Sequence, residues 1–317
     1  GYQGVFASET LPLLTLPWDL FTMDKMEFFG RVNFLKGALV FSDFVTTVSK
    51  KYSEEIQTSE YGFGLEGVLR ARAATVTGIL NGVDYDDWSP EKDKLIAANY
   101  SAANLDGKEL CKKDLLEQFG LASADPKLPV VGIVSRFATQ KGFDLIAQIA
   151  DRLVREDAIT VALGTGEKDY EDLFRKLAQA FPRKFGVKVG FDNTLAHKIE
   201  AGSDMFLMPS RYEPSGLNQM YSLKYGTVPI VRATGGLDDT IEPFDVTTGR
   251  GTGFKFWDYN GEAMLATIKA ALALFRDQAL WQKLMKNGMA KDYSWGVSAK
   301  EYVRVYERAR QSRGVNA

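Results

Sequence analysis

The 317-residue sequence has little of several features that mark particular classes of protein. Its one cysteine, Cys111, rules out an internal disulfide framework and is typical of a reducing compartment, so we expect a cytoplasmic protein. Its one histidine, His197, argues against a zinc site of cysteine and histidine. No apolar run reaches the roughly 18 residues of a membrane-spanning helix. Lysine and arginine (39) nearly balance aspartate and glutamate (41), so neither nucleic acid nor a membrane is an expected partner.

The start of the chain also lacks familiar signals. It reads Gly-Tyr-Gln-Gly-Val-Phe, with no initiator methionine, no basic segment and no apolar core of a signal peptide. We interpret this as a chain entered in the middle of a domain, and keep a processed mature start as the alternative. The length is ample for two domains of ordinary size.

Residues 125–290 alternate short apolar runs with stretches of helical period. The runs predicted to be strands are 130–134, 159–163, 187–189, 205–208 and 228–231. Strands and helices that alternate over short connections indicate βαβ units and a mostly parallel sheet covered on both faces. Sheets of this kind bind ligands at the carboxyl ends of their strands.

The first third of the chain and the tail are less regular. The elements that we expect there are a helix and then a strand in 34–49, a strand in 76–80, a helix in 108–119, and an amphipathic helix in 295–310. The small, polar, proline-containing stretch 120–129 is the predicted linker between two domains.

Two cations stand where the first strand of the regular region gives way to a helix. Arg136 and Lys141 lie five residues apart in this turn. A helix N-terminus presents free N–H groups and a partial positive charge, so it already favours an anion. Arginine adds a planar fork for phosphate oxygens, and lysine adds a mobile point charge. The segment predicts a diphosphate clamp, and a pair of solvated surface cations is the alternative.

A second turn of this kind follows the apolar run 205–208. Gly216 allows close approach of the backbone to a ligand, and the N–H groups of 216–218 can donate to a phosphate. Glu213 stands just before this turn, where a carboxylate would repel phosphates unless it binds something else. A sugar hydroxyl is a suitable partner, because an ionised carboxylate is a strong acceptor. The alternative is an acid that caps the following helix.

Three further features are weak when taken alone. Gly164 belongs to a G-x-G turn after the strand 159–163, and a pair of glycines at 235 and 236 follows the strand 228–231. Phe191 follows the strand 187–189, where an aromatic ring can stack on a base. For a single phenylalanine, packing in the core is the alternative.

The chain resembles bacterial glycogen synthases and plant starch synthases. The matching segments, in the family's order and spacing, are 2–6, 47–56, 79–84, 135–142, 209–219, 225–229 and 234–237. The resemblance implies an α/β protein of the GT-B fold: two Rossmann-like domains with parallel sheets facing a cleft, the first of them incomplete. It divides the chain into the C-terminal part of the acceptor-side, starch synthase catalytic domain (1–122), a nucleotide-sugar-binding domain (123–292), and a helix crossing back to the first domain (293–317).

The resemblance also implies an activity. Members transfer glucose from ADP-glucose to the non-reducing end of an α-1,4-glucan, with retention of configuration and without a metal or cofactor. The expected partners are therefore ADP-glucose and a glucan such as glycogen or starch. The expected location is the cytoplasm, or a plastid in a plant.

By position, the resemblance implies that Arg136, Lys141 and Glu213 are the catalytic residues. The two cations would bind the donor's diphosphate, and Glu213 the glucosyl group. The implied donor-binding residues are Asn81, Gly164, Phe191, Ser215, Gly216, Leu217 and Asn218. Among these, Phe191 would stack on adenine, Asn81 would face the donor sugar, and the turn 215–218 would bind the distal phosphate.

The chain departs from the pattern of the wider superfamily at several points. Tyr221 replaces a second glutamate eight residues after Glu213, a replacement shared by glycogen and starch synthases. Ser215 stands where many bacterial members have cysteine, and Asn218 where many have threonine. The Lys-x-Gly-Gly loop and the His-Asn pair expected near the start are absent, and His197 lies in the second domain and cannot replace that histidine.

These departures leave alternatives open. We expect roughly the first third of a complete synthase to be missing, and the exposed edges of half a domain to reduce solubility. One alternative is therefore a truncated nucleotide-binding fragment without catalysis. Another is a different GT-B glycosyltransferase of the sucrose-phosphate synthase type, although such enzymes normally keep the second glutamate. A phosphorylase would need a lysine that binds pyridoxal phosphate, and the sequence has no convincing motif for one.

Overall fold

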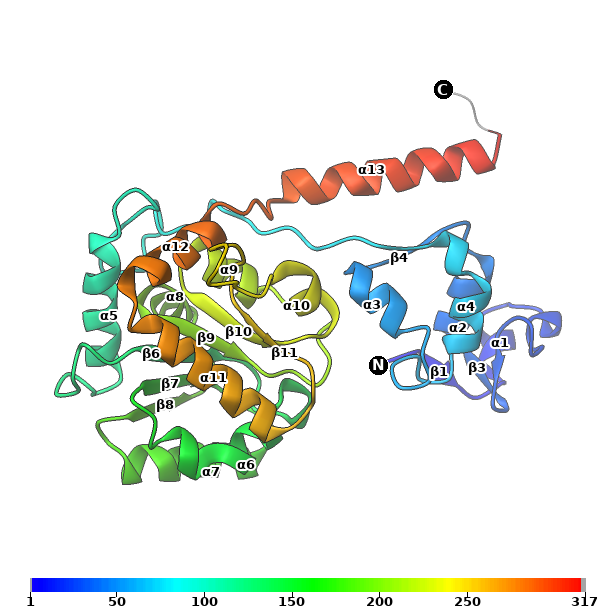
Figure 1. The fold of residues 1–317 in the computed structure, drawn as a ribbon. Helices are drawn as coiled ribbons and strands as arrows, with labels where there is room; N and C mark the ends of the chain where they lie inside the picture. The colour runs from blue at the N-terminus through cyan, green and yellow to red at the C-terminus, as the bar shows by residue number, and fades with distance from the viewer. Residues whose placement is uncertain (1, 315–317) are drawn as a thin grey trace. The chain divides into compact units, whose positions relative to one another are not determined.

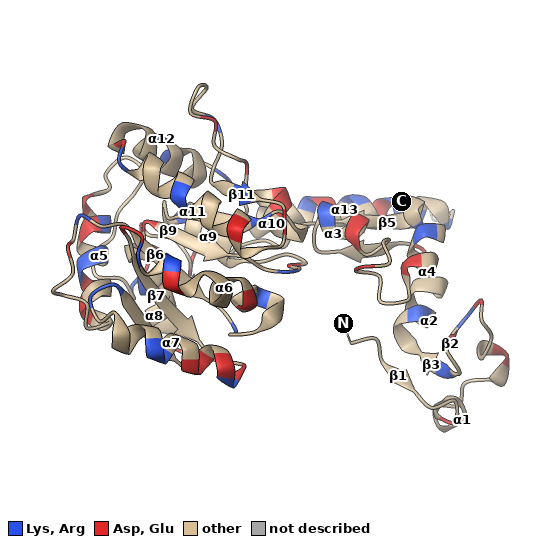
Figure 2. Cartoon of the chain, turned by 60° about the horizontal axis from the view of Figure 1, so that its bottom comes forward, with Lys and Arg blue, Asp and Glu red and all other residues tan. Residues whose placement is uncertain are grey.

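The computed structural model describes residues 2–314, which form two compact units. Of the described residues, one unit contains 2–80 and 299–314, and the other contains 81–298. Residue 1 and residues 315–317, at the ends of the first and third predicted segments, lie outside the described residues. Basic and acidic residues are interspersed along the elements of each unit (Figure 2), in keeping with the near balance of 39 and 41 in the sequence. Among residues 2–314, none of the helices combines the length and the apolar character that crossing a membrane requires.

The first unit holds two small sheets and several short helices (Figure 1). Its elements are β1 (Val5–Phe6), α1 (Thr10–Leu13), η1 (Trp18–Leu20), β2 (Glu27–Phe28), β3 (Arg31–Asn33), α2 (Phe34–Phe41), β4 (Val45–Thr47), α3 (Lys50–Glu55), α4 (Glu66–Ala71), η2 (Ala73–Thr75) and β5 (Val76–Gly78). Strands β1, β3 and β2 pair antiparallel, and β4 pairs with β5 in parallel. The predicted helix and strand in 34–49 and the strand in 76–80 are thus confirmed.

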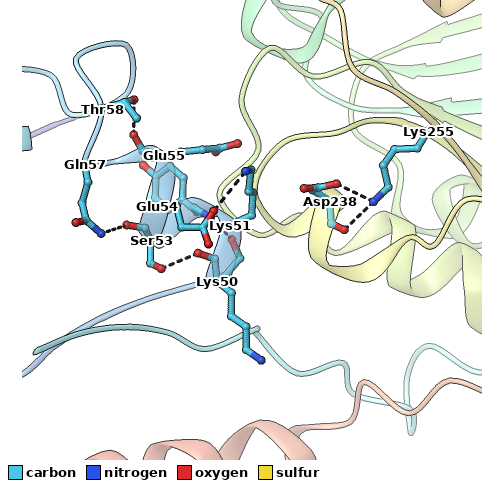
Figure 3. A network of polar contacts seen from close by, with 11 residues as sticks. Lys50, Lys51, Ser53, Glu54, Glu55, Gln57, Thr58, Asp238 and Lys255 are labelled. Carbon is cyan, nitrogen blue, oxygen red and sulfur yellow. Dashed lines mark hydrogen bonds and ion pairs between the residues drawn. The ribbon is translucent and has the colours of Figure 1, made fainter. Parts of the chain in front are cut away.

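Local hydrogen bonds explain where the helices of this unit begin. The Asn33 side chain accepts from the N–H of Lys36 at the start of α2, and the Ser49 hydroxyl accepts from Tyr52 at the start of α3. Within α3, Lys51 forms an ion pair with Glu54 at 3.3 Å (Figure 3). The caps formed by Asn33 and Ser49 satisfy N–H groups that have no acceptor inside the helix.

The final helix, α13 (Trp295–Ser312), has its residues from 299 onward in the same compact unit as residues 1–80. Just beyond the helix, the Arg313 side chain donates to the Asp43 carboxylate at 2.7 Å. Arg308 lies over the Phe44 ring, 4.9 Å from its centroid. The predicted helix in 295–310 is confirmed, and it ends two residues later than expected.

The second unit is built on a six-stranded parallel sheet in the order β11-β10-β9-β6-β7-β8 (Figure 1). Its strands are β6 (Val130–Val134), β7 (Ile159–Gly164), β8 (Phe185–Val189), β9 (Met205–Met208), β10 (Val228–Arg232) and β11 (Phe254–Phe256). The five strands predicted from apolar runs are confirmed, with small shifts at their ends. Strand β11 was not predicted.

Helices cover both faces of this sheet, as its apolar strands require. They are α5 (Asp106–Gln118), η3 (Thr139–Lys141), α6 (Phe143–Leu153), α7 (Lys168–Ala180), α8 (Asn193–Gly202), α9 (Asn218–Lys224), α10 (Gly235–Thr240), α11 (Gly261–Phe275) and α12 (Gln278–Met289). Alternate residues of one strand face opposite layers. Val131 and Ile133 pack in the core with α6, α7, α11 and α12, whereas Val130 packs in the core with α5 and α8.

The strand order changes direction at β6. Strand β7 follows β6 in the chain and pairs on one side of it, while β9 pairs on the other side. The loops that leave β6 and β9 therefore diverge, which opens a crevice at the carboxyl edge of the sheet. The carboxyl ends of β6, β7 and β9 are the expected place for a ligand.

The compact units divide the chain at Leu80 rather than at residue 122, the end of the predicted first domain. Residues 81–122 belong to the second unit because α5 is tied to its core. The ammonium group of Lys108 donates to the carbonyls of Ala201 and Tyr225 at 2.9 and 3.1 Å. The predicted linker 120–129 thus joins two elements of one unit. The functional roles assigned to the three segments stay predictions.

A buried carboxyl lies between α8 and α9. Glu200 is fully buried and accepts a hydrogen bond from the Ser222 hydroxyl at 2.6 Å. Burial raises the pKa of the Glu200 carboxyl to about 8, because a charged carboxylate is poorly solvated there. Nearby Lys108, also buried, has a pKa lowered to about 8 by its own burial.

We predict that Glu200→Gln stabilises the protein increasingly as the pH rises from about 5 to about 8. A carboxyl with a raised pKa contributes its full stability below its ordinary value of 4.5 and loses it as the pH rises through about 8. Glutamine has the same shape and does not ionise. Thermal unfolding of both proteins across this range measures the difference, with Glu117→Gln on the exposed face of α5 as control. A difference in melting temperature between Glu200→Gln and the parent chain that stays the same at every pH would contradict the prediction.

Candidate functional site

A cavity of about 510 Å³ opens at the carboxyl ends of β6, β7, β8 and β9. Eight of the ten predicted site residues line it: Arg136, Lys141, Gly164, Phe191, Glu213, Gly216, Leu217 and Asn218. Of the other two, Ser215 is buried in the turn before α9, and Asn81 is half-buried outside this cavity. The structure therefore brings most of the predicted residues together at the point where the strand order changes direction.

The two predicted cations have different surroundings. Arg136 is exposed, and its guanidinium donates to the Gln140 side chain at 3.0 Å. Lys141, at the end of η3, places its ammonium group 2.6 Å from Oε2 of Glu213. Arg136 thus reaches into the cavity mouth, while Lys141 is already paired with the predicted catalytic carboxylate.

Glu213 is buried, with 6% of its surface exposed, and its charge is compensated locally. Besides Lys141, the Ser210 hydroxyl donates to the same carboxylate oxygen at 3.0 Å. The residue that caps α9 is Leu217, which offers no side-chain acceptor, so the helix-capping alternative for Glu213 is wrong. The ion pair was not visible in the sequence because its partners are 72 residues apart.

Close contact between two loops brings this pair together. Gly142 has φ +80°, and a Cβ atom there would lie 2.1 Å from the carbonyl oxygen of Pro209. The N–H of Arg211 donates to the Gln140 carbonyl at 2.9 Å. The turn after β6 therefore rests on the loop after β9, and only glycine permits this approach.

Helix α10 packs against the backbone of the loop that carries Glu213. Gly235 has φ +45°, and a Cβ atom there would lie 2.0 Å from the carbonyl oxygen of Glu213. The N–H of Gly236 donates to the same carbonyl at 3.0 Å. The glycine pair, a weak signal in the sequence, therefore shapes the site without lining it. Neighbouring Asp238 of this helix pairs with Lys255 of β11 at 2.7 Å (Figure 3).

Two amide side chains at the start of α9 fix the turn that precedes this helix. The amide nitrogen of Asn218 donates to the Val134 carbonyl at the end of β6 at 3.0 Å. The amide nitrogen of Gln219 donates to the carbonyls of Ser215 and Gly216 at 3.0 and 3.1 Å. This structural role of Gln219 was not predicted from the sequence, although an amide side chain next to a glycine turn can hydrogen-bond to the backbone of the turn. The first N–H groups of α9 have no acceptor inside the helix, which suits an anion in the adjoining cavity.

Phe191 lies at the cavity mouth with 92% of its surface exposed. The core-packing alternative for this ring is therefore wrong. Asp192 beside it caps α8 by accepting from the N–H of Leu195 at 2.8 Å. The stacking of Phe191 on a base stays a prediction.

His197 and Tyr221 lie away from the cavity, in a stack of rings. The Trp88 ring stacks on His197 at 3.7 Å and on Tyr221 at 4.0 Å between centroids. Nδ1 of His197 is 2.8 Å from the Asp93 carboxylate. The pKa of the Asp93 carboxyl lies below its ordinary value. Burial by itself would raise this pKa, but the hydrogen bonds with His197 and Tyr225 outweigh the effect of burial. Within residues 2–314, no cluster of three or more histidine, cysteine, aspartate or glutamate side chains could hold a metal ion.

Comparisons with known proteins agree with this geometry. Residues 1–71 match the model of the starch synthase catalytic domain, and residues 117–288 match that of glycosyl transferases group 1. A glycogen synthase of Koribacter versatilis is 69% identical over 99% of this chain and 64% of its own length. One from an Anaeromyxobacter species is 50% identical over 96% of this chain and 64% of its own length. The chain thus spans slightly less than two thirds of these relatives.

Solved structures give the same result. The catalytic domain of starch synthase IV from Arabidopsis thaliana, bound to ADP and acarbose, matches with a TM-score of 0.88 and 35% identity over 97% of this chain and 65% of its own. A sucrose-phosphate synthase from Thermosynechococcus elongatus matches with a TM-score of 0.57 and 20% identity over 86% of this chain and 59% of its own, which shows the fold alone. Together with the parallel sheet, these neighbours confirm the predicted α/β fold of the GT-B type.

We predict that Gly235→Ala destabilises the second unit by more than about 1 kcal/mol, because alanine disfavours the left-handed backbone. The added methyl group would also press on the carbonyl of Glu213. Urea unfolding measures the loss. Gly67→Ala, at an exposed position of α4 where a Cβ atom meets nothing within 4 Å, is the control and should not destabilise, because alanine favours a helix more than glycine does. Equal stabilities for Gly235→Ala and the parent chain would contradict the prediction.

Proposed function

Because the chain belongs to the group 1 glycosyl transferases, in the family of bacterial glycogen synthases and plant starch synthases, we propose that it acts as a glycogen (starch) synthase. In this proposal, glucose passes from ADP-glucose to the non-reducing end of an α-1,4-glucan with retention of configuration. The observation that carries the proposal is the assembly of Arg136, Lys141 and Glu213 in one cavity at the carboxyl edge of the sheet. The reaction would take place in the cytoplasm, or in the plastid of a plant.

The choice of ADP-glucose as donor has support from a relative. The starch synthase IV structure, 35% identical to this chain, contains ADP. Phe191, exposed at the mouth of the cavity, offers a ring face on which adenine can stack. Tyr221 replaces the second glutamate normal in the sucrose-phosphate synthase type, so the glycogen synthase type is favoured.

The chemistry follows from where charge develops. Breaking the bond between the anomeric carbon and the diphosphate leaves positive charge on the sugar and negative charge on the leaving group. Arg136 and Lys141 would stabilise the leaving diphosphate, and cations held in place before reaction do this without reorganisation. No metal or cofactor is required in this scheme. Glu213 would accept hydrogen bonds from the glucosyl group.

The ion pair between Lys141 and Glu213 refines these roles. The carboxylate beside the anion-binding turn is neutralised by Lys141, so it repels an incoming diphosphate less than an unpaired carboxylate would. When the donor binds, the lysine can share its charge between Glu213 and the phosphate oxygens, because an ammonium group has three donors. The two residues therefore work as one unit in the proposed mechanism.

We predict that Arg136→Ala and Lys141→Ala each lower glucosyl transfer by about 10²–10³, because each removes a charge that stabilises the leaving group. Release of ADP from ADP-glucose in the presence of glycogen measures the rate. Lys176→Ala, an exposed cation on α7, is the control.

Near-normal transfer by both variants would refute the assignment of the clamp. A parent chain that binds ADP in calorimetry but never releases it from ADP-glucose would favour the binding-only alternative. A preference for UDP-glucose would argue against the proposed donor.

We predict that Glu213→Gln abolishes transfer while ADP binds at least as tightly as before. The amide removes a negative charge beside the phosphates and frees Lys141 for them, but it is a weaker acceptor for the glucosyl group. Calorimetry with ADP and the transfer assay separate the two effects. A parallel loss of ADP affinity and transfer would show that Glu213 acts on the nucleotide or on the fold.

A further inference from the structure

Tyr259 does not line the cavity, yet it contacts the turn that carries Lys141. It lies between β11 and α11, and its phenol oxygen is 2.6 Å from the Asp144 carboxylate and 3.2 Å from the Thr139 carbonyl. Tyr259 can therefore act on a ligand in the cavity only through the residues that it contacts.

The two acceptors of the phenol stand at opposite ends of the segment that contains Lys141. Thr139 begins η3, and Asp144 lies in the first turn of α6. The phenol has one proton, which it donates mainly to the closer acceptor, the Asp144 carboxylate, while the Thr139 carbonyl takes a weaker share of the same proton. The phenol oxygen thus contacts both ends of the segment 139–144, with Lys141 between them. Burial, together with Asp144, raises the pKa of the Tyr259 phenol, so the group keeps its proton and donates at neutral pH.

The ring of Tyr259 is held by cations from two neighbouring strand ends. The guanidinium carbon of Arg211 lies 5.5 Å from the ring centroid, and that of Arg232 lies 5.3 Å from it. Arg211 also donates its backbone N–H to the Gln140 carbonyl in the same turn. The ring therefore links the loops that follow β9, β10 and β11 to the turn after β6.

The ammonium group of a lysine ends a flexible four-carbon stem and has no planar fork to orient it. The backbone of the turn therefore sets the origin from which the Lys141 ammonium group reaches a phosphate. On the side of the cavity, Lys141 is held by Glu213, a contact that a donor would share. The contacts of the Tyr259 phenol with the Asp144 carboxylate and the Thr139 carbonyl lie outside the cavity, so a ligand there does not compete for them.

We propose that Tyr259 is a positioning residue, which fixes the turn around Lys141 and so sets how strongly the cavity binds a diphosphate. This inference rests on the proposed function, because it takes the donor's diphosphate as the ligand of Lys141. Tyr259 makes no contact with the nucleoside in this scheme. Its influence is confined to the phosphate end of the ligand.

The test compares two ligands that differ only in the diphosphate. Tyr259→Phe removes the hydroxyl and keeps the ring between its cations. ADP is expected to bind about three- to tenfold more weakly to the variant, the effect of one lost hydrogen bond, while adenosine binds as before. Tyr293→Phe is the matched control, because its phenol donates to the Thr240 carbonyl at 2.9 Å and does not contact the turn.

A second arm places the same substitution in a Lys141→Ala background. Removal of the Tyr259 hydroxyl should there have no further effect on ADP affinity, because the cation that it positions is gone. An equal loss for ADP and adenosine, or an undiminished loss without Lys141, would overturn the inference in favour of a general structural role. Unchanged ADP affinity in Tyr259→Phe would also overturn it. A parent chain that does not bind ADP would instead overturn the proposed function.

Discussion

The site depends on one ion pair, between Lys141 and Glu213 at 2.6 Å. Glu213 is buried, and an uncompensated carboxylate in that place would cost several kcal/mol. Two close contacts make the pairing possible, because Gly142 lets the turn of Lys141 rest on Pro209, and Gly235 lets α10 rest on Glu213. A Cβ atom at either glycine would lie 2.0–2.1 Å from a carbonyl oxygen of the loop that carries Glu213, so this loop would have to shift. The glycines and the ion pair are therefore parts of one constraint.

The parallel sheet explains why residues so distant in sequence meet at all. Strands β6 and β9 are neighbours in the sheet although the chain passes through β7 and β8 between them. Their loops leave the same edge, and the change of strand order lets them diverge around a cavity. Arg136 and Lys141 come from one loop, and Glu213 comes from the other. The chemistry is thus supplied by the topology, and side chains such as Gln219 and Tyr259 hold the loops in place.

Sequence patterns predicted this region well where the signal was local. Continuous apolar runs gave β6 and β9, and the turn residues after them gave most of the residues that line the cavity. Features that depend on distant partners were missed. Strand β11 has only three residues, one of them the charged Lys255. Lysine is usually exposed, so the sequence did not indicate that Lys108 is buried in the second unit. There its ammonium group donates to three acceptors, which ties α5 to that unit rather than to a first domain ending at residue 122.

The surroundings of Tyr221 show why a second glutamate does not suit this chain. Burial, with the nearby carboxyl of Glu200, raises the pKa of the Tyr221 phenol to about 12. The same surroundings would disfavour an ionised carboxylate, because burial and the nearby negative charges of Asp84 and Asp87 both oppose a further negative group. An aromatic ring instead stacks on Trp88, whose other face stacks on His197. Position 221 has thus become part of the packing that holds residues 81–122 to α8 and α9. Within the cavity, Glu213 is the carboxylate that Lys141 neutralises.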